Sequence, residues 1–156
     1  MYKPKPLLRL TFYLLVATLT LFNQTLSANT GGDQVTLKGE LMDTWCYVSQ
    51  VMGPPQVVVG SSHHVCAVWC AAGGIPVGLL DHESGEIYMI LSVEGDGVGV
   101  ANEKLLDIQS HEISVTGTVY ELDGLNYLTI EKINEDHGIV NLTHEKFGII
   151  PGEARP

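Results

Sequence analysis

Basic side chains are scarce in this sequence. Its 156 residues include 8 Lys and Arg against 18 Asp and Glu, which gives a formal net charge of −10 at pH 7. An acidic surface repels phosphate backbones, so the composition argues against a nucleic-acid partner. The same surplus can attract cations, although we prefer the simpler explanation of a solvated acidic surface.

The sequence also has no apolar run long enough to cross a bilayer. The most apolar run, Leu10–Phe22, falls short of the ~20 residues that a membrane-spanning helix needs. It follows a short basic start and precedes small residues that end at Ala28. This layout predicts a secretory signal peptide over residues 1–28, with an uncleaved membrane anchor as the alternative. We therefore expect export to the periplasm or the extracellular space, with no membrane span left after cleavage.

The chain that remains after cleavage has the length of one domain. Residues 29–156 carry five basic and 18 acidic side chains, a net charge of −13. A chain of this length can bury a core without metals or disulfides. Glycines and prolines are frequent near its end and predict an irregular C-terminal tail from about residue 134.

Cysteine is rare, and its count is odd. All three cysteines, Cys46, Cys66 and Cys70, lie in the part of the chain that we expect to be exported. An oxidising compartment favours disulfides. Pairing two cysteines would leave one thiol over, so a purely structural role does not account for all three.

The hydrophobic pattern predicts a mainly β protein with one or two short helices. Gly73 and Gly74 would end the first helix, for which Ser61 and Ser62 are suitable N-caps. Asp123-Gly124 is a pair that type I′ turns prefer, so the last two strands should form a hairpin. The expected strands are 34–47, 75–81, 86–93, 111–122 and 125–133, and the expected helices are 63–72 and 101–108.

Five short strands favour a closed arrangement. An open sheet would need more helix to cover both faces, whereas a small barrel covers one face and protects its edges. Gly39 and Gly117 lie in mid-strand, where a barrel needs sharp bends. We expect a five-stranded barrel like the oligonucleotide/oligosaccharide-binding (OB) fold, with an open α+β sandwich as the alternative.

The segment "HHVCAVWC" places potential metal ligands at helical spacing. His63, Cys66 and Cys70 are at i, i+3 and i+7, so they share one face of a helix. His64 points away from Cys66 by about 160° in the same geometry. We therefore prefer His63 to His64 as a ligand, although His64 can still turn inward if the helix begins one residue later.

Cys46 completes a candidate set of four ligands. It ends the first expected strand, against which the helix must pack. Cys46, His63, Cys66 and Cys70 would form a tetrahedral Cys3His site for zinc, and thiolates also suit Cu(I). Asp43 could orient one of these ligands or simply form a turn. The neighbouring Trp45 and Trp69 could shield the site or belong to the core.

Two other interpretations remain open. A disulfide from Cys46 to either helix cysteine would staple the strand to the helix and leave one thiol free. Alternatively, Cys66 near a helix N-terminus could act as the nucleophile of a thiol oxidoreductase. The number of residues that act together separates these interpretations, since a metal site needs three or four and a staple needs two. No Ser-His-Asp order, phosphate-binding glycine loop or convincing carboxylate pair indicates another kind of catalysis.

The motifs "GELMDTWCY", "H-x-x-C-A-x-x-C", "GGIPVGLLD" and "VTGTVYELDGL" together resemble a largely uncharacterised family of small exported bacterial OB-like proteins. The resemblance covers roughly Val35 to Ile133. It implies that Cys46, His63, Cys66 and Cys70 belong together, and it supplies no reaction. We expect an exported protein that binds copper or zinc, either as a carrier or as an accessory to an exported redox protein.

Overall fold

The computed structural model describes residues 31–96 and 101–144. The predicted signal peptide lies outside the described residues, as do residues 145–156 of the predicted tail. Within the described part of the chain, no helix is both long enough and apolar enough to cross a membrane.

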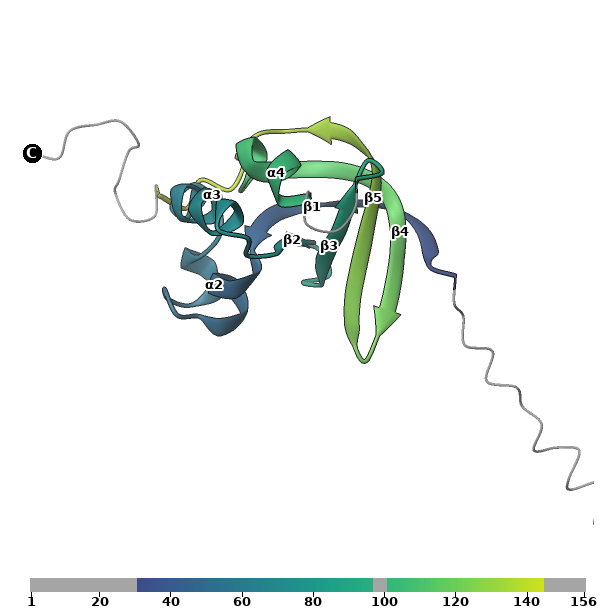
Figure 1. The fold of residues 1–156 in the computed structure, drawn as a ribbon. Coiled ribbons are helices and arrows are strands. Elements are labelled where there is room, and N and C mark those ends of the chain that lie inside the picture. Colours follow the sequence, from purple (N-terminus) through teal and green to yellow (C-terminus); the bar gives the residue numbers. More distant parts are fainter. Residues whose placement is uncertain (1–30, 97–100, 145–156) are drawn as a thin grey trace, which may run out of the picture. The chain divides into compact units, whose positions relative to one another are not determined.

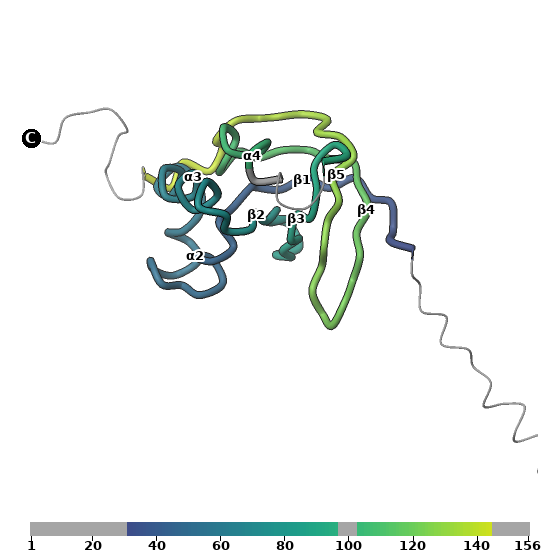
Figure 2. Tube along the Cα trace, in the orientation of Figure 1, coloured from purple at the N-terminus to yellow at the C-terminus, as the bar shows by residue number. Residues whose placement is uncertain are grey.

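The described residues form five strands and three short α-helices (Figures 1 and 2). The helices are α2 (Thr44–Ser49), α3 (His64–Ala72) and α4 (Ala101–Leu105). Single turns of 3-10 helix follow at Pro55–Val57 and Leu106–Ile108. The strands are β1 (Asp33–Asp43), β2 (Val77–Leu80), β3 (Ile87–Val93), β4 (Glu112–Leu122) and β5 (Leu125–Asp136).

The strands close into a barrel in the order β1-β2-β3-β5-β4, with β4 returning to β1. Strand β1 makes this closure possible because it pairs with two neighbours. Its Asp33–Glu40 part pairs with β4, and its last residues, from Glu40 to Asp43, pair with β2. All neighbouring strands are antiparallel except β3 and β5, which are parallel. The closed five-stranded barrel confirms the predicted OB-like fold and excludes the open sandwich.

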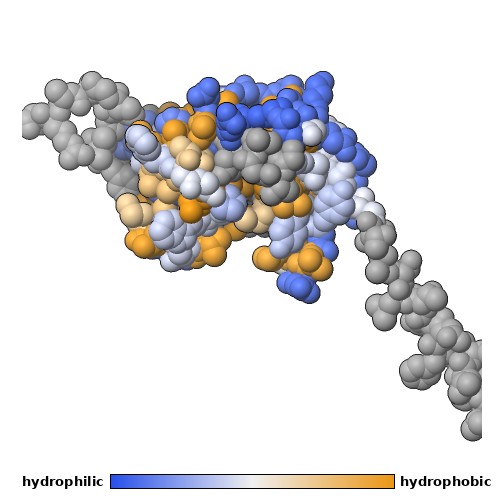
Figure 3. Space-filling view, viewed as in Figure 1, coloured by the Kyte–Doolittle hydropathy of each residue, from blue (hydrophilic) through white to orange (hydrophobic). Residues whose placement is uncertain are grey.

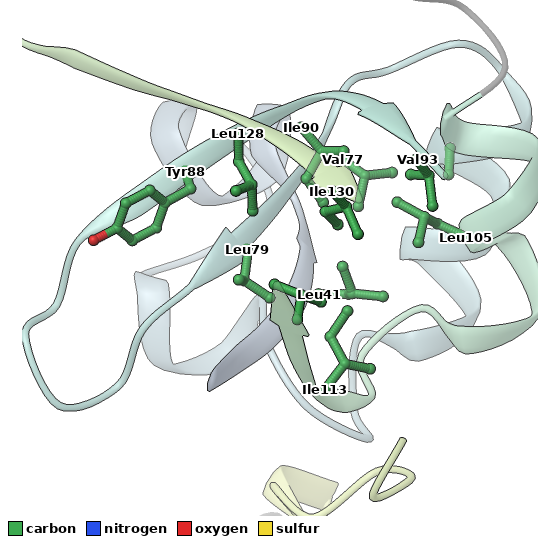
Figure 4. Close-up of a cluster of buried hydrophobic side chains, with 12 residues drawn as sticks. Leu41, Val77, Leu79, Tyr88, Ile90, Val93, Leu105, Ile113, Leu128 and Ile130 are labelled. Atoms are coloured by element: carbon green, nitrogen blue, oxygen red, sulfur yellow. The ribbon is translucent and has the colours of Figure 1, made fainter. Parts of the chain in front are cut away.

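The barrel interior is filled by the apolar residues of the alternating strands (Figure 4). In β4, Ile113 and Val115 are fully buried while their neighbours along the strand are partly exposed, as the period of two predicts. Leu105 of α4 is also fully buried and closes one part of this core. The fully buried members are Leu41, Leu79, Val93, Leu105, Ile113, Val115, Leu128 and Ile130.

Local sequence signals explain two features of the barrel. Asp123 and Gly124 both have positive φ, 53° and 77°, and join the paired residues Leu122 and Leu125, which confirms the predicted hairpin. Gly117, one of the two glycines at which we expected a bend, lies next to an irregularity in the β4–β5 register, where β5 has one extra residue.

The structure corrects the predicted boundaries around the cysteines. The first strand ends at Asp43 and not at Tyr47, so Cys46 belongs to helix α2. Neither Ser61 nor Ser62 caps α3. The N-cap position is His63, whose side chain makes no capping hydrogen bond.

The other helix and the last strand also differ from the prediction. The expected helix over 101–108 is α4 followed by a 3-10 turn. Strand β5 continues to Asp136, slightly beyond the point where we expected the tail to begin.

Candidate metal centre

Asp43 turns the chain from strand β1 into helix α2. Its Oδ1 accepts hydrogen bonds from the backbone N–H groups of Trp45 (2.9 Å) and Cys46 (3.1 Å). These bonds satisfy two of the donors that a helix leaves free at its N-terminus, and they fix α2 on the rim of the barrel. As a result Cys46 faces inward and is only 2% exposed.

His63 is held at the start of α3 by a loop anchored to the barrel. The carboxylate of Glu40, which lies in β1 and is buried, accepts hydrogen bonds from the N–H of Gly60 (2.5 Å) and the side-chain amide of Asn141 (2.9 Å). His82 Nε2 lies 2.8 Å from the same carboxylate. The His63 carbonyl then accepts the N–H of Ala67 as the first hydrogen bond of α3. This anchoring places the His63 imidazole in the interior, where it is 5% exposed.

Four side chains converge between β1, α2 and α3. One ligand atom from each of Asp43, Cys46, His63 and Cys66 lies within 4.8 Å of the other three. Asp43, Cys46 and His63 are buried, and Cys66 is partly exposed. We call this set the rim cluster. It contains the carboxylate, thiol and imidazole groups that metal ions bind in proteins.

The rim cluster contains two buried polar atoms that lack partners. Asp43 Oδ2 and His63 Nε2 lie 3.7 Å apart, which exceeds a hydrogen bond. Neither atom has any hydrogen-bond partner. Buried polar atoms are nearly always paired, so an orphan pair of this kind calls for an explanation. A cation between the two atoms would satisfy both.

Cys70 lies one helical turn beyond Cys66 and borders the rim cluster. Its thiol interacts with the Asp43 carboxylate and with Cys66. It is partly exposed, and none of the three cysteines forms a disulfide. The Asp43 carboxylate therefore interacts with two thiols, those of Cys46 and Cys70.

The two adjacent histidines have different surroundings. His64 Nδ1 lies 2.8 Å from the backbone oxygen of Gln109, and the His64 ring stacks on His111 with 6.5 Å between ring centroids. The contacts of His64 are therefore with Gln109 and His111, which lie outside the rim cluster. The structure brings His63 into the rim cluster and leaves His64 outside it.

Burial sets the protonation states in the cluster. It raises the pKa of Cys46 to about 12, helped by the nearby Asp43 carboxylate, and it also raises the pKa of Cys70 for the same two reasons. Burial opposes ionisation of Asp43 too, but the nearby thiols of Cys70 and Cys46 and the two backbone N–H groups that donate to Oδ1 outweigh it and lower its pKa. Burial lowers the pKa of His63, and Asp43 only partly offsets this.

These shifts describe the cluster before any metal binds. Near neutral pH, Asp43 is ionised, His63 is neutral, and the thiols of Cys46 and Cys70 keep their protons. Neutral imidazole and carboxylate are ready to act as ligands, whereas a thiol must lose its proton first. Metal binding would therefore release protons.

Sequence reasoning did not place Asp43 among the ligands, and considered it only as an orienting group or a turn residue. One signal could have found it. An Asp directly before a cysteine-containing segment, at the end of an alternating strand, is a strong N-cap. A cap three residues before Cys46 accepts the backbone N–H of that residue, which brings the carboxylate close to Cys46.

Comparisons with known proteins do not assign a function to the chain, so the assignment rests on the geometry of the rim cluster. No protein-family model, curated protein or solved structure matches the chain.

Proposed function

We propose that the protein binds a soft or borderline metal ion at the rim cluster, with zinc as the first candidate and Cu(I) as the second. The observation that carries the proposal is the orphan pair of Asp43 Oδ2 and His63 Nε2, buried beside two thiols. Two ligands of a tetrahedral zinc ion lie about 3.5 Å apart, given metal–ligand bonds of about 2.0–2.3 Å. The 3.7 Å between the orphan atoms is close to this value.

The donor set distinguishes the two metals. Asp43, Cys46, His63 and Cys66 offer one oxygen, one nitrogen and two sulfurs, a combination that suits zinc. Cu(I) prefers sulfur, so it would draw Cys70 in and dispense with the carboxylate. A substitution at Asp43 should therefore weaken the binding of zinc and not of Cu(I), whereas a substitution at Cys70 should weaken the binding of Cu(I) more than that of zinc.

The proposed role is that of an exported metal carrier or an accessory to an exported redox protein. Support comes from the leader-like residues 1–28 and from the resemblance of the Cys46, His63, Cys66 and Cys70 pattern to small exported bacterial proteins. The partial exposure of Cys66 and Cys70 gives an incoming metal or a recipient protein access to one side of the site.

The test is a metal titration of the reduced protein and matched variants. Zn²⁺ and Cu(I) are titrated in competition with a coloured chelator. For zinc, we expect Cys46→Ser, Cys66→Ser, His63→Ala and Asp43→Asn each to weaken binding at least tenfold, with a small effect of Cys70→Ser. For Cu(I), Cys70→Ser should weaken binding and Asp43→Asn should not. His64→Ala is the control, because His64 is bonded elsewhere.

Two results of this titration would contradict the proposal. If the reduced wild-type protein binds neither metal tightly, or if His64→Ala weakens binding as much as His63→Ala, the proposal is wrong. A release of protons on binding, measured in a weakly buffered solution, is an independent expectation, since the Cys46 thiol is protonated beforehand.

A disulfide-stapled binding module is the second candidate, and one observation favours it. The thiols of Cys46 and Cys66 lie close enough to interact in the structure. In that case two cysteine variants would lower the melting temperature together, while the third cysteine and both histidines would be silent. For the thiol oxidoreductase alternative, a raised pKa makes Cys46 and Cys70 poor nucleophiles, which leaves the partly exposed Cys66 as its nucleophile.

A further inference from the structure

A long part of the chain around the rim cluster carries no formal charge. The 37 residues from Thr44 to Leu80 include no Asp, Glu, Lys or Arg. The rest of the described chain carries 16 acidic and three basic residues. Helices α2 and α3 both lie in this uncharged segment. Within the described residues, the segment that forms α2 and α3 therefore contributes no Asp, Glu, Lys or Arg to the surface.

The same segment exposes large apolar side chains. We call six residues of α2, the turn after it and α3 the apolar face. Each of them is at least 54% exposed, and Trp69 reaches 73%. Figure 3 shows hydrophobic colour gathered over the α2 and α3 side of the molecule. The six residues are Trp45, Val48, Val51, Met52, Val65 and Trp69.

Helix α3 is oriented against the usual rule for a surface helix. A helix that covers a core normally turns its largest apolar residues inward. Here the small residues Ala67 and Ala71 are buried, while Val65 and Trp69 face outward one turn apart. Burying Trp69 would remove far more apolar area from water than burying either alanine. Folding of the single chain does not use this surface, which is the mark of an interface.

We infer that the apolar face is the contact between two copies of this chain. The charge distribution favours a second copy of the chain as the partner of the apolar face. Two copies of so acidic a protein repel each other, and uncharged faces are where they can meet with the least repulsion. An isologous pair matches the face with itself, so neutral surface meets neutral surface and four tryptophans share one interface. Tyr and Trp are the residues that most often anchor such contacts.

The pairing would also cover the open side of the rim cluster. Cys66 and Cys70 are partly exposed, and each follows a member of the apolar face, Val65 or Trp69. A second copy seated on that face would lie over both thiols and restrict access of water and oxidants. The pairing itself does not depend on a bound metal, so it can be tested whether or not the proposed metal site exists.

The test is the mass of the protein in solution as a function of concentration. Light scattering after gel filtration and analytical ultracentrifugation are run from about 1 to 200 μM protein, with reductant and chelator present to exclude disulfide and metal bridges. We expect twice the monomer mass at the upper end of the range. The chain has only two tryptophans, both in the apolar face, so dilution should shift their emission to longer wavelength.

A charge placed in the face should abolish the pairing. Trp69→Glu and Val48→Glu each put two like charges into an isologous contact and should give the monomer mass throughout. Leu122→Glu is the matched control, because Leu122 is an equally exposed leucine at the β4–β5 turn, outside the apolar face. It should leave the dimer mass unchanged. Both kinds of side chain are exposed, so the variants should fold, and circular dichroism checks this.

Several results would overturn the inference. They are a wild-type protein that stays monomeric across the range, or a dimer that survives Trp69→Glu and Val48→Glu. A monomer whose tryptophan emission shifts to shorter wavelength only with vesicles of phosphatidylcholine would assign the face to a membrane surface instead. Loss of the dimer in Leu122→Glu alone would move the contact to the hairpin.

Discussion

Substitutions at Asp43 should separate the stability of the fold from the binding of a metal. Asp43 Oδ1 caps helix α2 through two backbone N–H groups, whereas Oδ2 faces His63 Nε2 without a partner. Alanine removes both oxygens. Asparagine keeps an oxygen that can cap and loses the negative charge. We expect Asp43→Ala to lose stability and metal binding, and Asp43→Asn to lose chiefly metal binding.

The magnitude of the stability loss follows from the hydrogen bonds. Removing an N-cap costs about 1–2 kcal/mol. The N–H of Cys46 is buried, and leaving such a donor without an acceptor costs about 1–3 kcal/mol. The two costs describe partly the same bonds, so the total for Asp43→Ala is about 2–3 kcal/mol. That corresponds to a fall in Tm of about 6–12 °C for a domain of this size. Asp43→Asn should cost less than about 1 kcal/mol, because asparagine caps as well as aspartate.

Urea unfolding and thermal melts, with chelator and reductant present, measure the stability of the wild type, Asp43→Ala and Asp43→Asn. Zinc titration of the same three proteins measures their metal binding. Equal destabilisation by the two variants would refute the capping argument. Zinc affinity that is unchanged in Asp43→Asn would remove the carboxylate from the site and leave only the thiols and His63 as ligands.

Three further predictions concern the thiols, the pH dependence and the leader. At pH 8 a maleimide should label Cys66 before Cys46, since Cys46 is buried and, with a pKa of about 12, is thiolate only to the order of 10⁻⁴; faster labelling of Cys46, measured on digested peptides, would contradict this. The metal-free protein should lose stability as pH falls below about 6.5, because the unfolded chain protonates His63 before the folded one does, and the loss should level off below the folded pKa. His63→Gln should flatten this part of the urea-midpoint curve, and an unchanged slope would assign it to other groups. N-terminal sequencing of the exported protein should begin at Asn29, whereas an intact Met1 in the membrane fraction would indicate an anchor.

The barrel could be predicted from sequence because its signals are local. Alternation marks β4 and β5, and Asp123-Gly124 fixes the hairpin that joins them. The predicted closure followed from a shortage of helix to cover an open sheet. These signals depend on neighbours in the chain, so one sequence is enough to read them.

Helix α2 could not be predicted in the same way. Trp45 and Tyr47 are residues that strands favour, and they continue the pattern of β1. The helix forms because Asp43 caps it and because Cys46 fits against α3, a contact with a distant part of the chain. The exposure of Trp45 and Trp69 depends equally on tertiary packing. Small residues occupy the inner side of α3, so Trp69 of this helix lies outside the core.

The position of the rim cluster suits a site that must be both rigid and accessible. Asp43 terminates β1, which pairs with two strands of the barrel, so its carboxylate has a fixed place. His63 and Cys66 come from a segment that the buried carboxylate of Glu40 ties to the same strand. Access to the site is from the side of Cys66 and Cys70, which are partly exposed, whereas Cys46 is buried. A metal bound at the rim cluster would link β1, α2 and α3 through its ligands. It would stabilise the folded state, because the unfolded chain does not hold these ligands together. Its affinity should therefore appear as a rise in melting temperature with metal concentration.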